Sequence, residues 1–358
     1  MTDLALAPRL LLVPVSGPRG MGEFARALAI GRAVRARWPE VQLRFVVHRD
    51  APYAATLGDL ARRVPASPTL CTREVLEEIA SFRPQVVYFD NSGRTTQLRA
   101  ARAAGARIVY VSSRGRQRYK AFRLRWMQAI DEHWISYSAR LAGGLRWSER
   151  LKLRLLGRPV VKFLDAVLAP ADETGADTLL VAAGVSAETR LDVTIVPGGG
   201  SQYPDSRITP RMFAEWGESL AARGWNVLFV AGPSFDAPIA TGERLRLVRQ
   251  VEGGTLMALL ARSRLVLVNG GDTLVQTLAL NRPCVAVPIA GDQAQRIARA
   301  VALGAVLAPA LTEVEACCHA LLADDAALHA REAQVAAVGF QDAMPGIVAT
   351  IGRMLELA

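Results

Sequence analysis

The segment of residues 268–293 constrains the fold more than any other part of the chain. It reads as an apolar strand ending at Gly270 and Gly271, a short helix, a second apolar strand over residues 283–288, and a polar turn at Gly291. Two parallel strands joined through a helix place both of their carboxyl ends at one edge of a sheet. We therefore predict an α/β fold in which both turns open at the same edge, where open sheets of this kind bind ligands.

The first of these turns has the features of a phosphate site. Gly270 and Gly271 allow the backbone to approach a ligand closely, and a helix beginning near Asp272 offers free N–H groups and the positive end of its dipole. Thr273 and Gln276 are three residues apart and share the helix face nearest the turn. We predict a nucleotide-sugar site here. The alternatives are that Thr273 only caps the helix and that Gln276 is an ordinary polar helix residue.

A second glycine turn follows an apolar strand farther upstream. Gly198 is followed there by Gly199, Gly200, Ser201 and Gln202. Consecutive amides in such a turn can form an anion-binding concavity, and the Ser201 hydroxyl adds a further donor. We predict that this turn binds phosphate together with the first one. The alternatives are a tight loop without a ligand and a Gln202 that only faces solvent.

The order of these motifs resembles the donor-binding half of the GT-B glycosyltransferases. The likeness covers residues 194–305 and is nearest to the MurG type, which glycosylates lipid-linked cell-wall precursors; the nucleotide-sugar hydrolases of the pseudaminic acid pathway are also similar. It implies two Rossmann-like doubly wound domains that face an interdomain cleft. It also implies an inverting, metal-independent transfer of a hexosyl or N-acetylhexosaminyl group from a nucleoside diphosphate, with UDP favoured.

The resemblance extends to single residues of the predicted donor site. The family contacts sugar hydroxyls where this chain has Asp292 and Gln293, although Asp292 could instead cap the following helix. The family usually carries Glu at the position of Gln276, where a carboxylate holds the ribose hydroxyls. A neutral amide can still accept from one hydroxyl and donate to another, but it gives up the stronger charge-assisted bond.

Length and pattern favour two domains. A chain of 358 residues exceeds the usual size of a single hydrophobic core. We predict an N-terminal acceptor-binding domain at residues 1–165, a linker region at 166–190 and a donor-binding domain at 191–344. The resemblance implies that a C-terminal helix at residues 345–358 returns to the first domain. The strands predicted for the first domain are residues 10–16, 42–49, 86–92 and 107–113.

Two carboxylates are candidates for the base that a sugar transfer to a hydroxyl needs. Glu23 follows Gly20 and Gly22 after the first strand, at the place where related enzymes carry a histidine. A carboxylate can act as the base if burial raises its pKa, but the helix dipole alone also favours Glu in a first turn. Asp90 ends a strand and precedes residues 91–93, a turn suited to an acceptor phosphate. Asp90 could instead cap the next helix.

Metal and redox chemistry are not predicted. The four histidines follow no ligand or triad pattern and no Asp-x-Asp pair occurs, so we expect no metal and no cofactor beyond the nucleoside diphosphate sugar as co-substrate. Arg296 is a candidate for stabilising the leaving diphosphate. The four cysteines lack metal or CxxC spacing and Cys284 lies in an apolar strand, which favours reduced thiols in the cytoplasm. We expect neither a signal peptide nor a membrane-spanning segment.

The positive charge of the chain is concentrated in one region. Residues 114–162 hold 13 Lys and Arg against three acidic residues, so they account for the whole net charge of +10. Taken as one helix, residues 117–130 place four apolar residues on one stripe between arginines and a lysine. We predict that residues 114–162 bind an anionic membrane surface; the alternative is that the stripe packs into the core. The four stripe residues are Tyr119, Phe122, Trp126 and Ile130.

These observations leave more than one class of function open. The leading prediction is a glycosyltransferase of cell-envelope polysaccharide synthesis, such as lipopolysaccharide or capsule. It would act on a lipid-linked acceptor while bound peripherally to the inner face of the plasma membrane, as the MurG resemblance implies. The alternatives are a nucleotide-sugar hydrolase or epimerase on the same scaffold and a non-enzymatic binding module. No nucleic-acid motif accompanies the basic region, so nucleic acid is not predicted as a partner.

Overall fold

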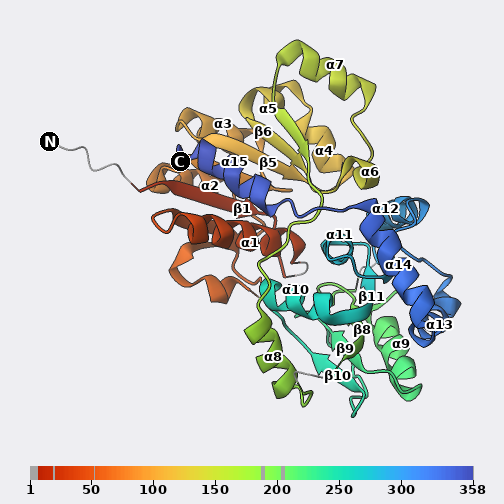
Figure 1. Ribbon diagram of the computed structural model, residues 1–358. Helices are drawn as coiled ribbons and strands as arrows, with labels where there is room; N and C mark the ends of the chain where they lie inside the picture. Colours follow the sequence, from red (N-terminus) through yellow and green to blue (C-terminus); the bar gives the residue numbers. More distant parts are fainter. Residues whose placement is uncertain (1–6, 19–20, 52, 187–189, 203–205, 358) are drawn as a thin grey trace. The chain divides into compact units, whose positions relative to one another are not determined.

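The computed structural model describes residues 7–18, 21–51, 53–186, 190–202 and 206–357. The chain divides into two compact units: unit 1 comprises Met1–Val167 with Ala343–Ala358, and unit 2 comprises Leu168–Asp342. Each unit is built on one parallel β-sheet (Figure 1). The predicted α/β class with two Rossmann-like units is therefore confirmed.

Unit 1 contains a seven-stranded parallel sheet in the order β3-β2-β1-β4-β5-β6-β7. The order reverses between β1 and β4, which makes the carboxyl ends of these two strands the topological switch point. The strands are β1 (Arg9–Pro14), β2 (Gln42–His48), β3 (Ala61–Val64), β4 (Val86–Asp90), β5 (Arg107–Ser112), β6 (Glu132–Ile135) and β7 (Val160–Phe163). The helices are α1 (Gly22–Arg37), η1 (Ala54–Leu60), α2 (Thr72–Phe82), α3 (Thr95–Ala103), α4 (Gly115–Ala121), α5 (Leu124–Ala129), α6 (Ala139–Ala142), α7 (Trp147–Leu156) and α15 (Met344–Met354).

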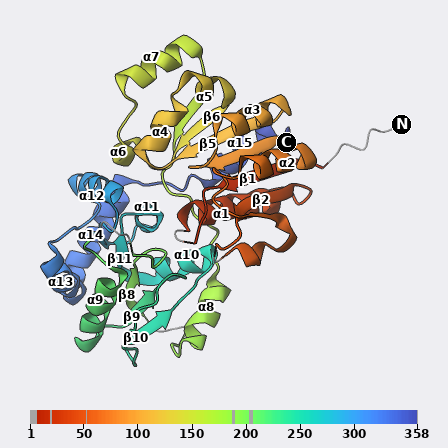
Figure 2. The same ribbon diagram turned by 180° about the vertical axis from the view of Figure 1, so that it is seen from behind.

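Strand β1 shows why this sheet is covered on both faces. Its side chains alternate, so that Leu10 and Leu12 join the core beneath α1 and α15, whereas Leu11 and Val13 join the core beneath α2 and α3. All four are fully buried. A strand buried on both faces reads as a continuous apolar run, which is typical of a parallel sheet. Figure 2 gives the reverse view of this layering.

The C-terminal helix α15 packs in unit 1, on the sheet face that α1 also covers (Figure 1). Its residue Gly352 lies against the Trp38 indole so closely that an added Cβ would stand 2.2 Å from Cη2 of the ring. Lys162 Nζ donates to Thr350 Oγ1 over 2.9 Å, and the Ala343 amide donates to the Ala166 carbonyl over 2.7 Å. Apolar packing and these hydrogen bonds therefore fix the end of the chain in unit 1.

Unit 2 contains a five-stranded parallel sheet in the order β10-β9-β8-β11-β12. Strands β8 and β11 are central neighbours, so the turns that follow them lie at the same edge. The strands are β8 (Leu191–Val196), β9 (Val227–Val230), β10 (Leu245–Val248), β11 (Ser263–Asn269) and β12 (Cys284–Val287). The helices are α8 (Glu173–Ala182), α9 (Pro210–Ala222), α10 (Gly253–Arg262), α11 (Asp272–Ala279), α12 (Gly291–Ala302), η2 (Leu311–Glu313), α13 (Val314–Ala323) and α14 (Asp325–Val338).

The predicted linker region at 166–190 contains a helix that the pattern did not indicate. Helix α8 begins after Asp172, whose side chain accepts from the Gly175 amide over 2.9 Å. It is fixed to α10 by ion pairs from Arg262 to Glu173 and to Asp177, the latter over 2.6 Å. Most of the predicted linker is therefore folded as part of unit 2.

Candidate functional site

The turn after β8 has several hydrogen-bond donors without an acceptor among the residues that the structure describes. Gly198 and Gly200 have φ angles of +98° and +79°, which favour glycine. Within the described residues, the amides of Gly199, Gly200 and Ser201 donate no hydrogen bond, and Ser201 Oγ is buried without a partner. Gln202 is exposed. Consecutive free amides with a buried hydroxyl are what an anionic ligand such as phosphate requires.

Glycine is sterically required at position 200. A Cβ on Gly200 would lie 2.6 Å from the Ala231 carbonyl oxygen and 2.6 Å from the Phe235 amide nitrogen. These are backbone atoms of the loop that follows β9, and the Gly199 carbonyl accepts from the Ser234 amide in this loop over 3.0 Å. The loop after β9 therefore holds the turn in place, so that the positions of its amides are fixed in the absence of a ligand.

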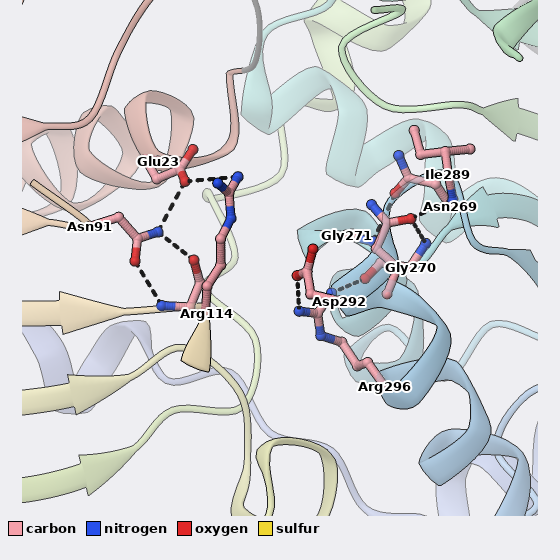
Figure 3. A network of polar contacts seen from close by, with 11 residues as sticks. Glu23, Asn91, Arg114, Asn269, Gly270, Gly271, Ile289, Asp292 and Arg296 are labelled. Carbon is pink, nitrogen blue, oxygen red and sulfur yellow. Dashed lines mark hydrogen bonds and ion pairs between the residues drawn. The ribbon is translucent and has the colours of Figure 1, made fainter. Parts of the chain in front are cut away.

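In the turn after β11, side chains hold the two glycines. The Gly270 amide donates to Gln293 Oε1 over 3.2 Å. The Gly271 amide donates to Asn269 Oδ1 over 2.8 Å (Figure 3). The Arg296 guanidinium donates to the Gly270 carbonyl. The amides of Gly270 and Gly271 are thus already bonded within the protein.

The absence of side chains on Gly270 and Gly271 makes room for these partners. A Cβ on Gly270 would lie 2.7 Å from Gln293 Cβ, and one on Gly271 would lie 2.8 Å from Asn269 Oδ1. The N–H donors predicted at the start of the helix belong to the first turn of α11. There the N-cap is Gly271, which has no side chain to cap the helix.

Thr273 and Gln276 lie on α11 as predicted, and both are half-buried. The Thr273 carbonyl accepts from Thr277 Oγ1 over 2.8 Å. The helix has no side-chain cap, so Thr273 does not have the capping role that was its alternative. Asp272 begins the helix, where its acidic side chain lies at the positive end of the dipole.

The turn before α12 is connected to the turn after β11. Gln293 is buried, and its Oε1 also accepts from the Ile289 amide over 2.8 Å. Its carbonyl oxygen therefore joins two turns of the protein, and the contact of Gln293 with a sugar stays a prediction. Asp292 pairs with Arg296 over 3.0 Å and lies inside the helix, whose N-cap is Ala290, so it is not the cap. Arg296 is buried and donates to Asp292 and to the Gly270 carbonyl, and its role in stabilising the leaving diphosphate stays a prediction.

In unit 1, Glu23 is part of a polar cluster at the topological switch point. Its side chain, in the first turn of α1, is 14% exposed. Asn91 Nδ2 donates to Glu23 Oε1 over 3.0 Å, and the Arg114 guanidinium lies 3.8 Å from the same oxygen (Figure 3). Asn91 follows β4 with a φ of +51°, and its Oδ1 accepts from the Ser113 amide over 2.9 Å. Gly20, the other glycine of the predicted motif, lies outside the described residues.

Asp90, unlike Glu23, is enclosed in the protein interior. It is completely buried, and Arg26 donates to both carboxylate oxygens over 2.8 and 2.9 Å. Tyr88 OH adds a third hydrogen bond of 2.9 Å. Burial raises the pKa of Asp90 to about 6, although the charge of Arg26 opposes that shift. A carboxylate enclosed in this way cannot reach an acceptor hydroxyl, and it does not cap α3, whose N-cap is Arg94.

The predicted amphipathic helix in the basic region is not present as one element. Helix α4 ends at Ala121 and α5 begins at Leu124, and three of the four stripe residues lie in the core: Phe122, Trp126 and Ile130 are at most 4% exposed. Trp126 packs edge-on against Tyr110. The alternative that the stripe is part of the core is therefore right for these three residues, whereas Tyr119 is 61% exposed.

Helix α7 presents the apolar surface of the basic region instead. Trp147, Leu151 and Leu155 are 78%, 48% and 75% exposed, and their spacing of four places them on one stripe. Arg150 and Arg154 are exposed beside this stripe. Sequence analysis did not single out α7.

Three further observations on the described part of the chain concern metal ions, thiols and membranes. No group of three His, Cys, Asp or Glu side chains there could hold a metal ion. The four cysteines are free, and burial raises the pKa of Cys284 to about 12. None of the described helices is long and apolar enough to cross a bilayer.

Comparison with solved structures identifies the fold. No family model and no curated sequence matches the chain. The glycotransferase of kitacinnamycin is 15% identical with a TM-score of 0.60, covering 98% of this chain and 99% of that one. MurG of Acinetobacter baumannii is 13% identical with a TM-score of 0.61, covering 97% of this chain and 99% of that one. The Streptomyces sp. SF2575 glycosyltransferase SsfS6, in complex with thymidine diphosphate, is 13% identical with a TM-score of 0.65 (97% and 99%). The chain has the fold of the GT-B glycosyltransferases.

Proposed function

We propose that this protein is a metal-independent, inverting glycosyltransferase that uses a nucleoside diphosphate sugar, with UDP favoured. The observation that carries the proposal is the turn after β8, whose donors bond to none of the described residues, together with the start of α11, which has no side-chain cap. Backbone amides and a helix N-terminus stabilise a diphosphate without a metal ion. The GT-B fold supports the same reading, since SsfS6 was solved with thymidine diphosphate.

The proposed chemistry uses Glu23 as the base. Glu23 would accept the proton of the acceptor hydroxyl while the acceptor oxygen forms a bond to the anomeric carbon of the sugar. The bond from that carbon to the diphosphate oxygen breaks, and the diphosphate leaves with the electron pair. Its negative charge would be stabilised by the amides of Gly199 and Gly200 and by the start of α11. Asn91 would hold the Glu23 carboxylate in the orientation for proton transfer, through its hydrogen bond to Oε1.

We propose further that the acceptor is lipid-linked or membrane-associated, in cell-envelope polysaccharide synthesis, and that α7 contacts an anionic membrane. The only acidic residue of α7, Glu149, is buried and pairs with Arg118 over 2.6 Å, so the exposed face carries arginines and no carboxylate. Exposed Trp and Leu side chains beside arginines suit the headgroup layer of an anionic bilayer. Enzyme bound in this way would lie at the inner face of the plasma membrane.

The membrane proposal is tested by sedimentation with vesicles. The native protein should sediment with vesicles of phosphatidylglycerol and remain in solution with vesicles of phosphatidylcholine. A variant with serine at Trp147, Leu151 and Leu155 should lose at least tenfold in vesicle binding, whereas Val181→Ser, which removes an apolar residue of similar exposure from unit 2, should bind normally. Equal sedimentation of the triple variant and the native protein would exclude α7 as the membrane contact.

The enzymatic proposal is tested with a panel of nucleotide sugars, each incubated with the protein in the presence and absence of membrane lipid extract. Release of nucleotide only when the lipid extract is present supports the transferase. Release without lipid indicates a hydrolase on the same scaffold, and interconversion of the nucleotide sugars indicates an epimerase. No turnover and no binding of any nucleotide sugar would contradict the proposal.

A further inference from the structure

Asn269 stands between the two glycine turns of unit 2. It is the last residue of β11, next to β8 in the sheet, and only 6% of its surface is exposed. Its side chain lies at the carboxyl edge, where both turns begin (Figure 3). Sequence analysis did not assign it a role, although a buried-strand asparagine directly before two glycines is a signal that could have been noticed.

Both polar atoms of the Asn269 amide are engaged with the backbone. Nδ2 donates to the Pro197 carbonyl over 2.7 Å, and Oδ1 accepts from the Gly271 amide over 2.8 Å. Pro197 begins the turn after β8, and Gly271 is the N-cap of α11. One rigid side-chain amide therefore connects the two turns and sets the distance between them.

The Asn269 amide occupies the space that a Cβ would need at two neighbouring glycines. A Cβ on Gly198 would lie 2.3 Å from Asn269 Nδ2, and one on Gly271 would lie 2.8 Å from Asn269 Oδ1. Gly198 also has a left-handed φ of +98°. Gly271, for which we predicted close approach of a ligand, and Gly198 thus make room for Asn269.

We infer that Asn269 is a positioning residue for diphosphate binding, which it serves by holding the free amides after β8 in register with the start of α11. The inference rests on the proposed nucleotide site and adds a residue that does not itself touch the ligand. Donors that are fixed in advance lose less conformational entropy on binding than donors that must be ordered by the ligand. We therefore expect loss of the amide to lower the affinity for the nucleotide while the melting temperature changes little.

The matched control is a second hydrogen bond between the same two strands. Thr194 on β8 and Ser263 on β11 are joined by their hydroxyls over 2.6 Å, and both are fully buried. Thr194→Val removes this bond and retains the shape of the side chain. It thus measures the structural cost of losing one buried link between β8 and β11, away from the turns.

The experiment measures the affinity for UDP by titration calorimetry, together with the melting temperature, in full-length protein. We expect Asn269→Ala to bind UDP at least tenfold more weakly than the native protein, and Thr194→Val to bind within twofold of it, at comparable melting temperatures. Hydrogen exchange at the Gly271 amide without nucleotide should be faster in Asn269→Ala only. Asn269→Ser, whose hydroxyl is too short to reach both partners, should show the same loss if the alanine variant does not fold.

The possible failures can be told apart. If the native protein binds UDP and Asn269→Ala binds it within twofold, the role of Asn269 is wrong while the nucleotide site stands. If Thr194→Val loses as much affinity as Asn269→Ala, the effect belongs to sheet stability and the inference is wrong. If the native protein binds neither UDP nor thymidine diphosphate, the proposed function fails and the inference fails with it.

Discussion

Replacing Gly200 by alanine tests the geometry of the turn after β8. We expect this substitution to lower the free energy of unfolding in two ways. An alanine at φ +79° costs about 1–2 kcal/mol because of the left-handed backbone. The new Cβ would also lie 2.6 Å from two backbone atoms, Ala231 O and Phe235 N, which cannot rotate away as a side chain could. Such overpacking costs about 1–3 kcal/mol more.

Gly224→Ala is the matched control for this prediction. Gly224 also lies in unit 2 and has a φ of +94°, but a Cβ there meets no atom within 4 Å. It therefore incurs the backbone cost without the clash. We expect Gly200→Ala to lower the free energy of unfolding by about 1–3 kcal/mol more than Gly224→Ala does.

The assays are urea denaturation and UDP titration of both variants. The clash can be relieved only by moving the turn from the β9 loop, which displaces the amides of Gly199 and Ser201. We therefore expect Gly200→Ala to lose more than tenfold in UDP affinity and Gly224→Ala to keep native affinity. Equal stability of the two variants, or native UDP affinity in Gly200→Ala, would refute this account of the turn.

Three further predictions concern other parts of the molecule. Glu23→Gln should lower kcat by about 10²–10⁴-fold and leave UDP affinity unchanged; full turnover would exclude it as the base. Gln276→Ala should weaken UDP binding about fivefold if Gln276 makes the hydrogen bond to the ribose that we propose, and unchanged affinity in titration would remove it from the site. Burial and, to a lesser extent, the charge of Arg118 lower the pKa of His133 to about 3. Below pH 6.5 the unfolded chain therefore binds a proton at His133 that the folded protein does not bind. The free energy of unfolding should then fall as the pH drops from 6.5 towards 3, by up to about 1.4 kcal/mol per pH unit. Asp90, with its raised pKa, acts in the opposite direction between about pH 4 and 6, so the test compares the native protein with His133→Gln by denaturation at each pH; identical pH profiles would contradict the prediction.

The fold could be predicted because its signals are local. Apolar strands that end in glycine turns and alternate with helices fix a parallel sheet, and the order of the turns fixes the edge at which a ligand would bind. The strand of residues 107–113 was predicted within one residue of β5. The position of the turns after β8 and β11 thus followed from the sequence alone, whereas helix α8 and the break between α4 and α5 did not.

The roles of single side chains could not be predicted in the same way. Gln293 accepts from an amide 23 residues away and Asn269 donates to a carbonyl 72 residues away in sequence, and only the packing of the strands brings these groups together. The stripe through Phe122 and Trp126 fits a surface helix and a core equally well, since both need apolar residues at helical spacing. The break between α4 and α5 and the packing against Tyr110 place that stripe in the core.

The most direct test of the central claim is a crystal structure of the protein with UDP. The account predicts that the diphosphate accepts hydrogen bonds from the amides of Gly199, Gly200 and Ser201 and lies at the first turn of α11 beside Thr273. Binding of UDP elsewhere on the protein, or electron density that shows protein side chains packed against these amides in place of the diphosphate, would contradict it.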